Sequence, residues 1–301
     1  MAISAKIIAD SLSFYAIDGR FYEGVRITTY QLRYPRFIHA ELMTHRVFSR
    51  NASSSRAIPV LTMLKEIIKD PAMPVYWGAN QSGMQAKSEL TGVKRWLAKK
   101  VWRAARYPAV AAAYLAYKIG LHKQIANRIC EPWAHINVLV TSTEYRNWDE
   151  LRRHEDAQPE IRELANLMFE KRALSSPDRL KPGDWHLPYV RQVERKLPID
   201  DQIKISVARC ARVSYLTHDA KEPDFRQDLS LYRRLVGSYP LHASPAEHQA
   251  TPDRLTASGI DFAKIAKTWQ FGNVWKTPAL HGNLRGFIQY RKTLTGEFVE
   301  G

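Results

Sequence analysis

Residues 25–56, VRITTYQLRYPRFIHAELMTHRVFSRNASSSR, predict a strand, then a helix, then a polar loop. β-Branched and aromatic residues dominate 25–32, as is typical of a strand. Pro35 ends that strand, because proline has no N–H for the sheet and restricts the residue before it. Proline also suits the first turn of a helix, and the pattern that follows predicts a helix over 36–46. The helix face toward the core would hold Ile38, Leu42 and His45.

The loop from His45 to Arg56 contains three arginines, one histidine and four serines, and no acidic residue. Fixed cations and short hydroxyl groups are what an anion such as phosphate needs. The preceding helix would present its C-terminal end, which carries partial negative charge. An anion there must therefore be held by Arg46, Arg50 and Arg56. The alternative interpretation is a solvated basic loop.

Length and composition leave room for one large domain or two ordinary ones. The chain has 301 residues, of which 45% are hydrophobic, so it can bury a sizeable core. No apolar run reaches the roughly 18 residues of a membrane span, and the N-terminus does not resemble a secretory signal. Cys130 and Cys210 give neither a disulfide framework nor a cysteine-based zinc site. A reducing, cytoplasmic setting is expected.

The formal net charge of +15 is compatible with nucleic-acid binding and with small polyanions. The arginines are scattered and form no long basic tract, which favours small anions such as nucleotides, dinucleotide cofactors or folates. The predicted helix from about Val93 to Gly120 mixes Trp, Lys and Arg, and Pro108 is expected to break or kink it. Membrane-surface or nucleic-acid contact is one interpretation of this helix. The solvated face of a core-packed helix is the favoured one.

Three segments are expected along the chain. Residues 1–175 form a core with the Ser/Arg loop and a helical region, 176–202 form a proline-rich linker, and 203–301 form a second part. Residues 37–46 and 284–291 echo one another, since both are basic and of helical pattern.

Several separated blocks resemble the flavin-dependent thymidylate synthases. The family signature is Arg-His-Arg, seven residues, then Ser and Arg, and the chain has Thr44-His45-Arg46 followed by Ser54-Ser55-Arg56. The family's Ala-Arg-Ile-Val-Leu-Pro block is similar to Asn127–Pro132. Its Asn-x4-Arg-x5-Gln-x-Glu-Ile pattern resembles Asn147 through Ile161.

Two further blocks stand in a different order from the family. Ala211-Arg212-Val213-Ser214 and His242-Ala243-Ser244-Pro245-Ala246-Glu247-His248 resemble elements that precede the Arg-His-Arg helix in family members. Here they follow it, as in a circular permutation. Alternatively, residues 284–291 are a second copy of that helix.

The resemblance implies a mixed α+β fold, with a central antiparallel sheet flanked by long helices, in a homo-oligomer that is a tetramer in the family. It implies FAD as cofactor, NADPH and methylenetetrahydrofolate as co-substrates, and reductive methylation of dUMP at C5 to give dTMP. No metal and no membrane are expected, and nucleic acid is not a favoured partner.

The resemblance also assigns roles residue by residue. Arg152 is the expected catalytic residue, since an arginine polarises the uracil in the family. The expected substrate contacts are Glu41, Ser54, Ser55, Arg56, Arg128 and Arg152. The expected FAD contacts are His45, Arg46, Asn147, Ser214, His242, Ser244 and Glu247. The chemistry of these side chains fits, because a planar cation stabilises charge developing on a carbonyl and imidazole can orient a flavin ring.

Four positions depart from the family pattern. Glu41 replaces a glutamine, Thr44 replaces the first arginine of the signature, Ala52 replaces a glutamate, and Asp156 stands where a histidine often lies. These changes leave open a related pyrimidine nucleotide or a hydroxymethyl product. They also leave open a homologue without activity, and the charge leaves open a non-catalytic nucleic-acid-binding protein. For His242 and His248 a zinc site is the rival, but their spacing does not place them on one helix face.

Overall fold

A computed structural model describes residues 3–17, 19–213, 224–256 and 274–298. Its main sheet has five strands in the order β3-β4-β2-β1-β5, antiparallel except for the β1–β5 pair. These strands are β1 (Ser4–Ile17), β2 (Arg20–Pro35), β3 (Ser49–Ala52), β4 (His135–Ser142) and β5 (Asp178–Leu180). The predicted mixed α+β class is confirmed, and the sheet is antiparallel apart from one edge.

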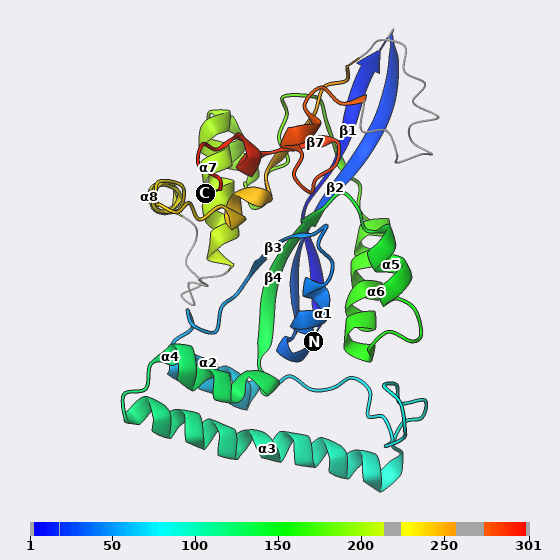
Figure 1. The fold of residues 1–301 in the computed structure, drawn as a ribbon, viewed down its shortest axis with the longest axis vertical. Coiled ribbons are helices and arrows are strands. Elements are labelled where there is room, and N and C mark those ends of the chain that lie inside the picture. Colours follow the sequence, from blue (N-terminus) through cyan, green and yellow to red (C-terminus); the bar gives the residue numbers. More distant parts are fainter. Residues whose placement is uncertain (1–2, 18, 214–223, 257–273, 299–301) are drawn as a thin grey trace.

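Helices surround this sheet on both faces and at one end (Figure 1). The α-helices are α1 (His39–Met43), α2 (Val60–Lys69), α3 (Gly92–Lys118), α4 (Lys123–Ala126), α5 (Arg146–Arg152), α6 (Pro159–Ala173), α7 (Ile199–Arg212) and α8 (Phe225–Val236). The helix predicted over 36–46 is shorter than expected, because a 3-10 turn occupies its start and α1 ends at Met43.

Strand β4 shows why the sheet is covered on both sides. Its apolar residues alternate between two clusters, since successive strand side chains point to opposite faces. Val138 and Val140 pack in the main core with α6, whereas Leu139 packs with Cys210 of α7. A strand buried on both faces reads as a continuous apolar run, which is what residues 138–140 show.

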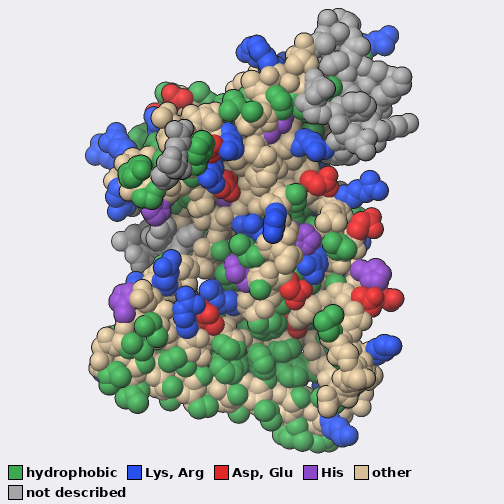
Figure 2. Space-filling view, in the orientation of Figure 1, with side chains coloured by type: hydrophobic (Ala, Val, Ile, Leu, Met, Phe, Trp, Pro, Cys, Tyr) green, Lys and Arg blue, Asp and Glu red, His purple; other side chains and the backbone are tan. Residues whose placement is uncertain are grey.

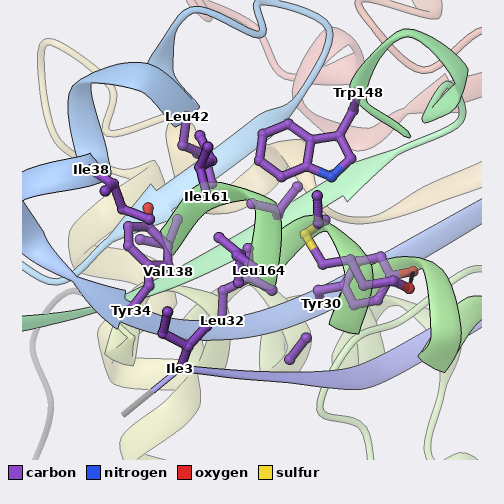
Figure 3. Packing of buried hydrophobic residues seen from close by; sticks show 14 of the residues in the cluster. Ile3, Tyr30, Leu32, Tyr34, Ile38, Leu42, Val138, Trp148, Ile161 and Leu164 are labelled. Atoms are coloured by element: carbon purple, nitrogen blue, oxygen red, sulfur yellow. Dashed lines mark hydrogen bonds between the residues drawn. The ribbon is translucent and has the colours of Figure 1, made fainter. Parts of the chain in front are cut away.

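The main core lies between the sheet and the pair α5–α6 (Figure 3). Tyr30 and Leu32 of β2 point into it, and Ile161 and Leu164 of α6 meet them from the other side. Trp148 of α5 closes one end of this cluster and is 1% exposed. Helix α5 is therefore held rigidly, and so is Arg152 at its last turn.

Helices α2, α3 and α4 form a layer at the end of the sheet (Figure 1). Of the two effects expected of Pro108, a break or a kink, the break does not occur, because α3 continues through it. Pro108 removes one N–H from the helix and leaves the carbonyl of Ala104 without its usual donor. Both residues are exposed, so water can satisfy that carbonyl.

The C-terminal third packs against the first part of the chain. Asn51 of β3 donates its side-chain amide to the carbonyl of Cys210 at 2.6 Å. Part of the segment expected as a linker adds β5 to the main sheet. Residues 284–291 do not form the predicted helix, since β7 (Phe287–Gln289) pairs with β6 (Ala250–Pro252) instead. Strand pairing has overridden the local helical pattern there.

Candidate active site

Arg152 is the centre of a hydrogen-bonded cluster at the end of α1. Its Nε donates to Nε2 of His45 at 2.9 Å, its Nη1 to Oε2 of Glu41 at 3.2 Å, and its Nη2 to Oγ1 of Thr44 at 3.1 Å. The three partners come from two adjacent turns of chain, while Arg152 comes from α5. A guanidinium has five N–H donors, so this cluster leaves two of them for a ligand.

His45 is neutral in this cluster. Burial, followed by the charges of Arg152 and Arg50, lowers the pKa of His45 to about 4. Its Nε2 therefore accepts the Arg152 hydrogen bond, and its ring stacks on Phe48 and meets Trp148 edge-on. The imidazole fixes the orientation of Arg152 without adding a second positive charge.

Thr44 replaces the arginine of the family pattern, and the structure shows what it contacts. Its hydroxyl accepts from Arg152 and donates to the carbonyl of Glu41 at 2.7 Å. An arginine at this position would bring a second guanidinium toward Arg152. The threonine is instead a positioning residue for it.

A separate cavity of about 570 Å³ lies beyond β3. Ser54 and Arg56 of the polar loop line one side, and His242 and Ser244 line another. These pairs are almost two hundred residues apart in the chain. The other lining residues are Asn51, Ala52, Ala57, Lys123, Gln124, Leu235 and Pro245. The resemblance assigned the two pairs to different ligands, whereas the structure places them around the same cavity.

The cavity is basic. None of its lining residues is acidic, and Arg56 and Lys123 both contribute to it. The Arg56 guanidinium makes no hydrogen bond or ion pair with any residue that the structure describes. Within the described part of the chain, Lys123 donates only to the carbonyl of Ala57, at 3.3 Å. Uncompensated cations beside hydroxyl groups are suited to an oxyanion.

Ser55 and Arg128 meet at a carboxylate rather than at this cavity. The Ser55 hydroxyl donates to Oε1 of Glu131 at 2.8 Å, and Arg36 pairs with the same oxygen at 3.1 Å. Arg128 is exposed and lies 3.9 Å from the other Glu131 oxygen. Glu131 thus takes contacts that were expected to go to a nucleotide phosphate.

The remaining predicted residues lie apart from both groups. Arg46 and Asn147 are exposed, and their side chains make no hydrogen bond with the described part of the chain. Glu247 pairs with Arg291, and burial raises the pKa of the Glu247 carboxyl. Ser214 lies outside the described residues. Ala211 and Arg212, which belong to a strand in the family pattern, end helix α7 instead.

Arg50 was expected to help hold an anion, whereas Lys123 and Glu131 had no predicted role. Arg50 donates to the carbonyls of Met43 and His45, and so connects the loop to the end of α1. Lys123 lines the wall of the basic cavity, and Glu131 accepts the hydrogen bond from Ser55. Lys123 follows the short α3–α4 connection, and no local pattern marks it as a ligand.

Comparisons with known proteins identify the family of the chain. Residues 19–177, more than half of the chain, match the family described as thymidylate synthase complementing protein. The matched range includes α1, the polar loop and Arg152, and it ends before the His242–His248 block. Among curated proteins no significant match is found.

Solved structures with a similar fold include a UMP/dUMP methylase, PolB, from Streptomyces cacaoi. Bound with 5-Br dUMP it is 17% identical, with a TM-score of 0.44, over 57% of this chain and 90% of that chain. Bound with 5-Br UMP it is 16% identical, with a TM-score of 0.44, over 57% of this chain and 88% of that chain. On the family match, the chain belongs to the thymidylate synthase complementing protein family and is a thymidylate synthase-like methyltransferase.

Proposed function

We propose that the protein methylates C5 of a uracil nucleotide, with dUMP as substrate and dTMP as product, using FAD, NADPH and methylenetetrahydrofolate. The observation that carries the proposal is the Arg152 cluster, in which a cation is held from three sides and keeps two donors. The basic cavity beyond β3 supports the second requirement, a place for phosphate, because Arg56 and Lys123 line it and none of the described residues that line it is acidic.

Arg152 would act on the pyrimidine ring. Attack by C5 on a one-carbon unit shifts electron density within the ring and its carbonyl groups. A guanidinium that is already oriented stabilises such charge without reorganisation. Glu41, Thr44 and neutral His45 hold Arg152 in that orientation, so none of the four is required as a nucleophile.

The basic cavity fits a phosphorylated ligand. Arg56 and Lys123 offer cations, Ser54 and Ser244 offer hydroxyl groups, and His242 offers an imidazole. These groups suit the phosphates of the nucleotide or of FAD. When bound, the flavin would supply the reducing equivalents that convert the transferred one-carbon unit to methyl. By resemblance, we also propose that the active form is a homo-oligomer.

The test is a mass measurement of the nucleotide product. Purified protein is incubated with FAD, NADPH and methylenetetrahydrofolate, and with dUMP, dCMP or UMP in parallel. We expect a methylated product from dUMP, with NADPH consumed. A hydroxymethylated product, or a product from another nucleotide alone, would replace the proposed reaction by the related one.

Variants connect the activity to the site. Arg152→Ala should abolish turnover, whereas Arg146→Ala, with the same charge change on the same helix, should retain it. A wild-type protein that binds dUMP and flavin but forms no product under any condition would instead identify a homologue without activity.

A further inference from the structure

Helix α3 carries an apolar face that packs against nothing in the described part of the protein. Its inner face is buried, with Ala113 and Ala116 packed in the α2–α4 layer. On the outer face, seven large apolar side chains are between 45% and 72% exposed: Val93, Trp96, Leu97, Val101, Tyr107, Tyr114 and Leu115. Figure 2 shows hydrophobic side chains gathered over this layer, at the bottom of the view.

The spacing of these residues places them on one side of the helix. Val93, Tyr107 and Tyr114 are separated by multiples of seven residues, which returns them to the same side of a helix. Trp96 and Leu97 extend the surface at one end and Leu115 at the other. Unpartnered apolar surface of this extent marks an interaction site more often than an ordinary solvated face.

The same face is cationic and has no acidic residue. Helix α3 contains seven lysines and arginines and neither Asp nor Glu. Lys94, Lys100, Arg103 and Lys118 are exposed. Lys100 and Lys118 lie over the rings of Trp96 and Tyr114, at 5.4 and 5.6 Å from the centroids. Cations therefore border the exposed aromatic rings along the helix.

We propose that this outer face of α3 docks onto the surface of an anionic lipid membrane. Lysine and arginine would contact the headgroups, while Trp96, Leu97 and Tyr107 would enter the boundary between headgroups and acyl chains. The helix would lie in the plane of the membrane, and no described helix is long and apolar enough to cross one. The proposal departs from the expectation that the protein has no membrane contact.

The charges and aliphatic side chains of α3 favour an anionic membrane over a second copy of the chain and over nucleic acid. A second copy docking through α3 would bring two sets of cations together, with no carboxylate on either α3 to neutralise them. Nucleic acid would satisfy the cations but would leave Val93, Leu97 and Leu115 without suitable partners, since aliphatic side chains neither pair with phosphates nor stack as aromatic rings do. An anionic bilayer satisfies both the cations and the aliphatic groups.

Sedimentation with vesicles tests the proposal. Full-length protein is mixed with vesicles of phosphatidylcholine alone, or with about one third phosphatidylglycerol. We expect binding to the anionic vesicles, weakened by salt, and at least about tenfold weaker binding to neutral ones. Lys100→Glu with Arg103→Glu should reduce anionic binding about tenfold or more, because each cation near such a surface contributes to attraction.

Matched control variants show whether vesicle binding depends on the outer face of α3 or only on the total charge and hydrophobicity of the protein. Arg233→Glu with Arg234→Glu makes the same charge change on α8 and should bind as the wild type does. Trp96→Ser with Leu97→Ser should lose binding, whereas Leu174→Ser with Val193→Ser, at similarly exposed apolar positions, should not. Circular dichroism confirms that each variant is folded.

Several results would overturn the proposal. These are no sedimentation with anionic vesicles, equal binding to neutral ones, or equal losses in the α8 controls. Self-association that Trp96→Ser with Leu97→Ser abolishes, without vesicle binding, would identify a second copy as the occupant. DNA binding that needs Lys100 and Arg103 but not Trp96 and Leu97 would identify nucleic acid.

Discussion

The substitution Arg209→Met tests the ion cluster that holds α7 to its neighbours. Arg209 is 4% exposed and makes four hydrogen bonds through its guanidinium, two to Glu194, one to Asp228 and one to the carbonyl of Tyr189. The Asp228 side chain is fully buried. This cluster positions α7, whose Cys210 carbonyl receives the Asn51 amide at the wall of the basic cavity.

The magnitude follows from what Arg209 leaves behind. Removing one partner of a buried ion pair costs roughly 3–5 kcal/mol, because the remaining charge loses its compensation. In the Arg209→Met protein, Glu194 would still accept hydrogen bonds from Arg191, and Asp228 would still accept them from Arg212. We therefore expect the lower end, about 3 kcal/mol of unfolding free energy.

Urea unfolding followed by circular dichroism measures this loss. The control is Arg212→Met, which removes a partly exposed arginine that, among the described residues, is bonded to Asp228 alone. This change should cost about 1–2 kcal/mol. An Arg209→Met protein within about 1 kcal/mol of the wild type, or no less stable than the Arg212 variant, would refute the reasoning.

Three further predictions concern the site and its pH dependence. Thr44→Val removes a hydrogen-bond acceptor of Arg152 and should lower kcat roughly fivefold with KM little changed, which is the cost of about one hydrogen bond. Steady-state kinetics measure both constants, and an unchanged kcat would contradict the positioning role of Thr44. Arg56→Ala should weaken dUMP binding at least about tenfold in a calorimetric titration, more at low salt than at high salt, and a salt-independent loss would argue against phosphate contact. Hydrogen bonds from Arg209 lower the pKa of Glu194 from 4.5 to about 2. The ionised Glu194 therefore stabilises the folded protein above pH 4.5, and this stabilisation is lost as the pH falls toward about 2. Urea midpoints measured against pH should show this loss of stability in acid for the wild type and a smaller loss for Arg209→Met.

Part of the site could be predicted from the sequence because it is local. Strand β2 follows from periodicity and proline, and Glu41, Thr44 and His45 fall together because they lie three and four residues apart, on adjacent turns of chain. The basic character of residues 45–56 follows from composition, but Ser49–Ala52 pairs with β4 as strand β3 instead of belonging to a loop. The family resemblance added Arg152, and the structure places its guanidinium against all three.

Other features were decided only by tertiary contacts. Residues 284–291 have a helical pattern, but Phe287–Gln289 pairs with β6 as a strand. Helix α3 continues through Pro108, which lies on the solvent-exposed side of that helix. Ser55 turned toward Glu131, a residue that is distant in sequence and was given no role.

The sequence, read with the family resemblance, therefore predicted the fold class, the basic character of residues 45–56 and Arg152 as a candidate catalytic residue. The tertiary structure decided that Ser54 and Arg56 share a cavity with His242 and Ser244, and that Thr44 holds Arg152. The physical reason is that strand and helix periodicities act over a few residues. Contacts between segments almost two hundred residues apart depend on how α7 and the sheet pack, which no local pattern specifies.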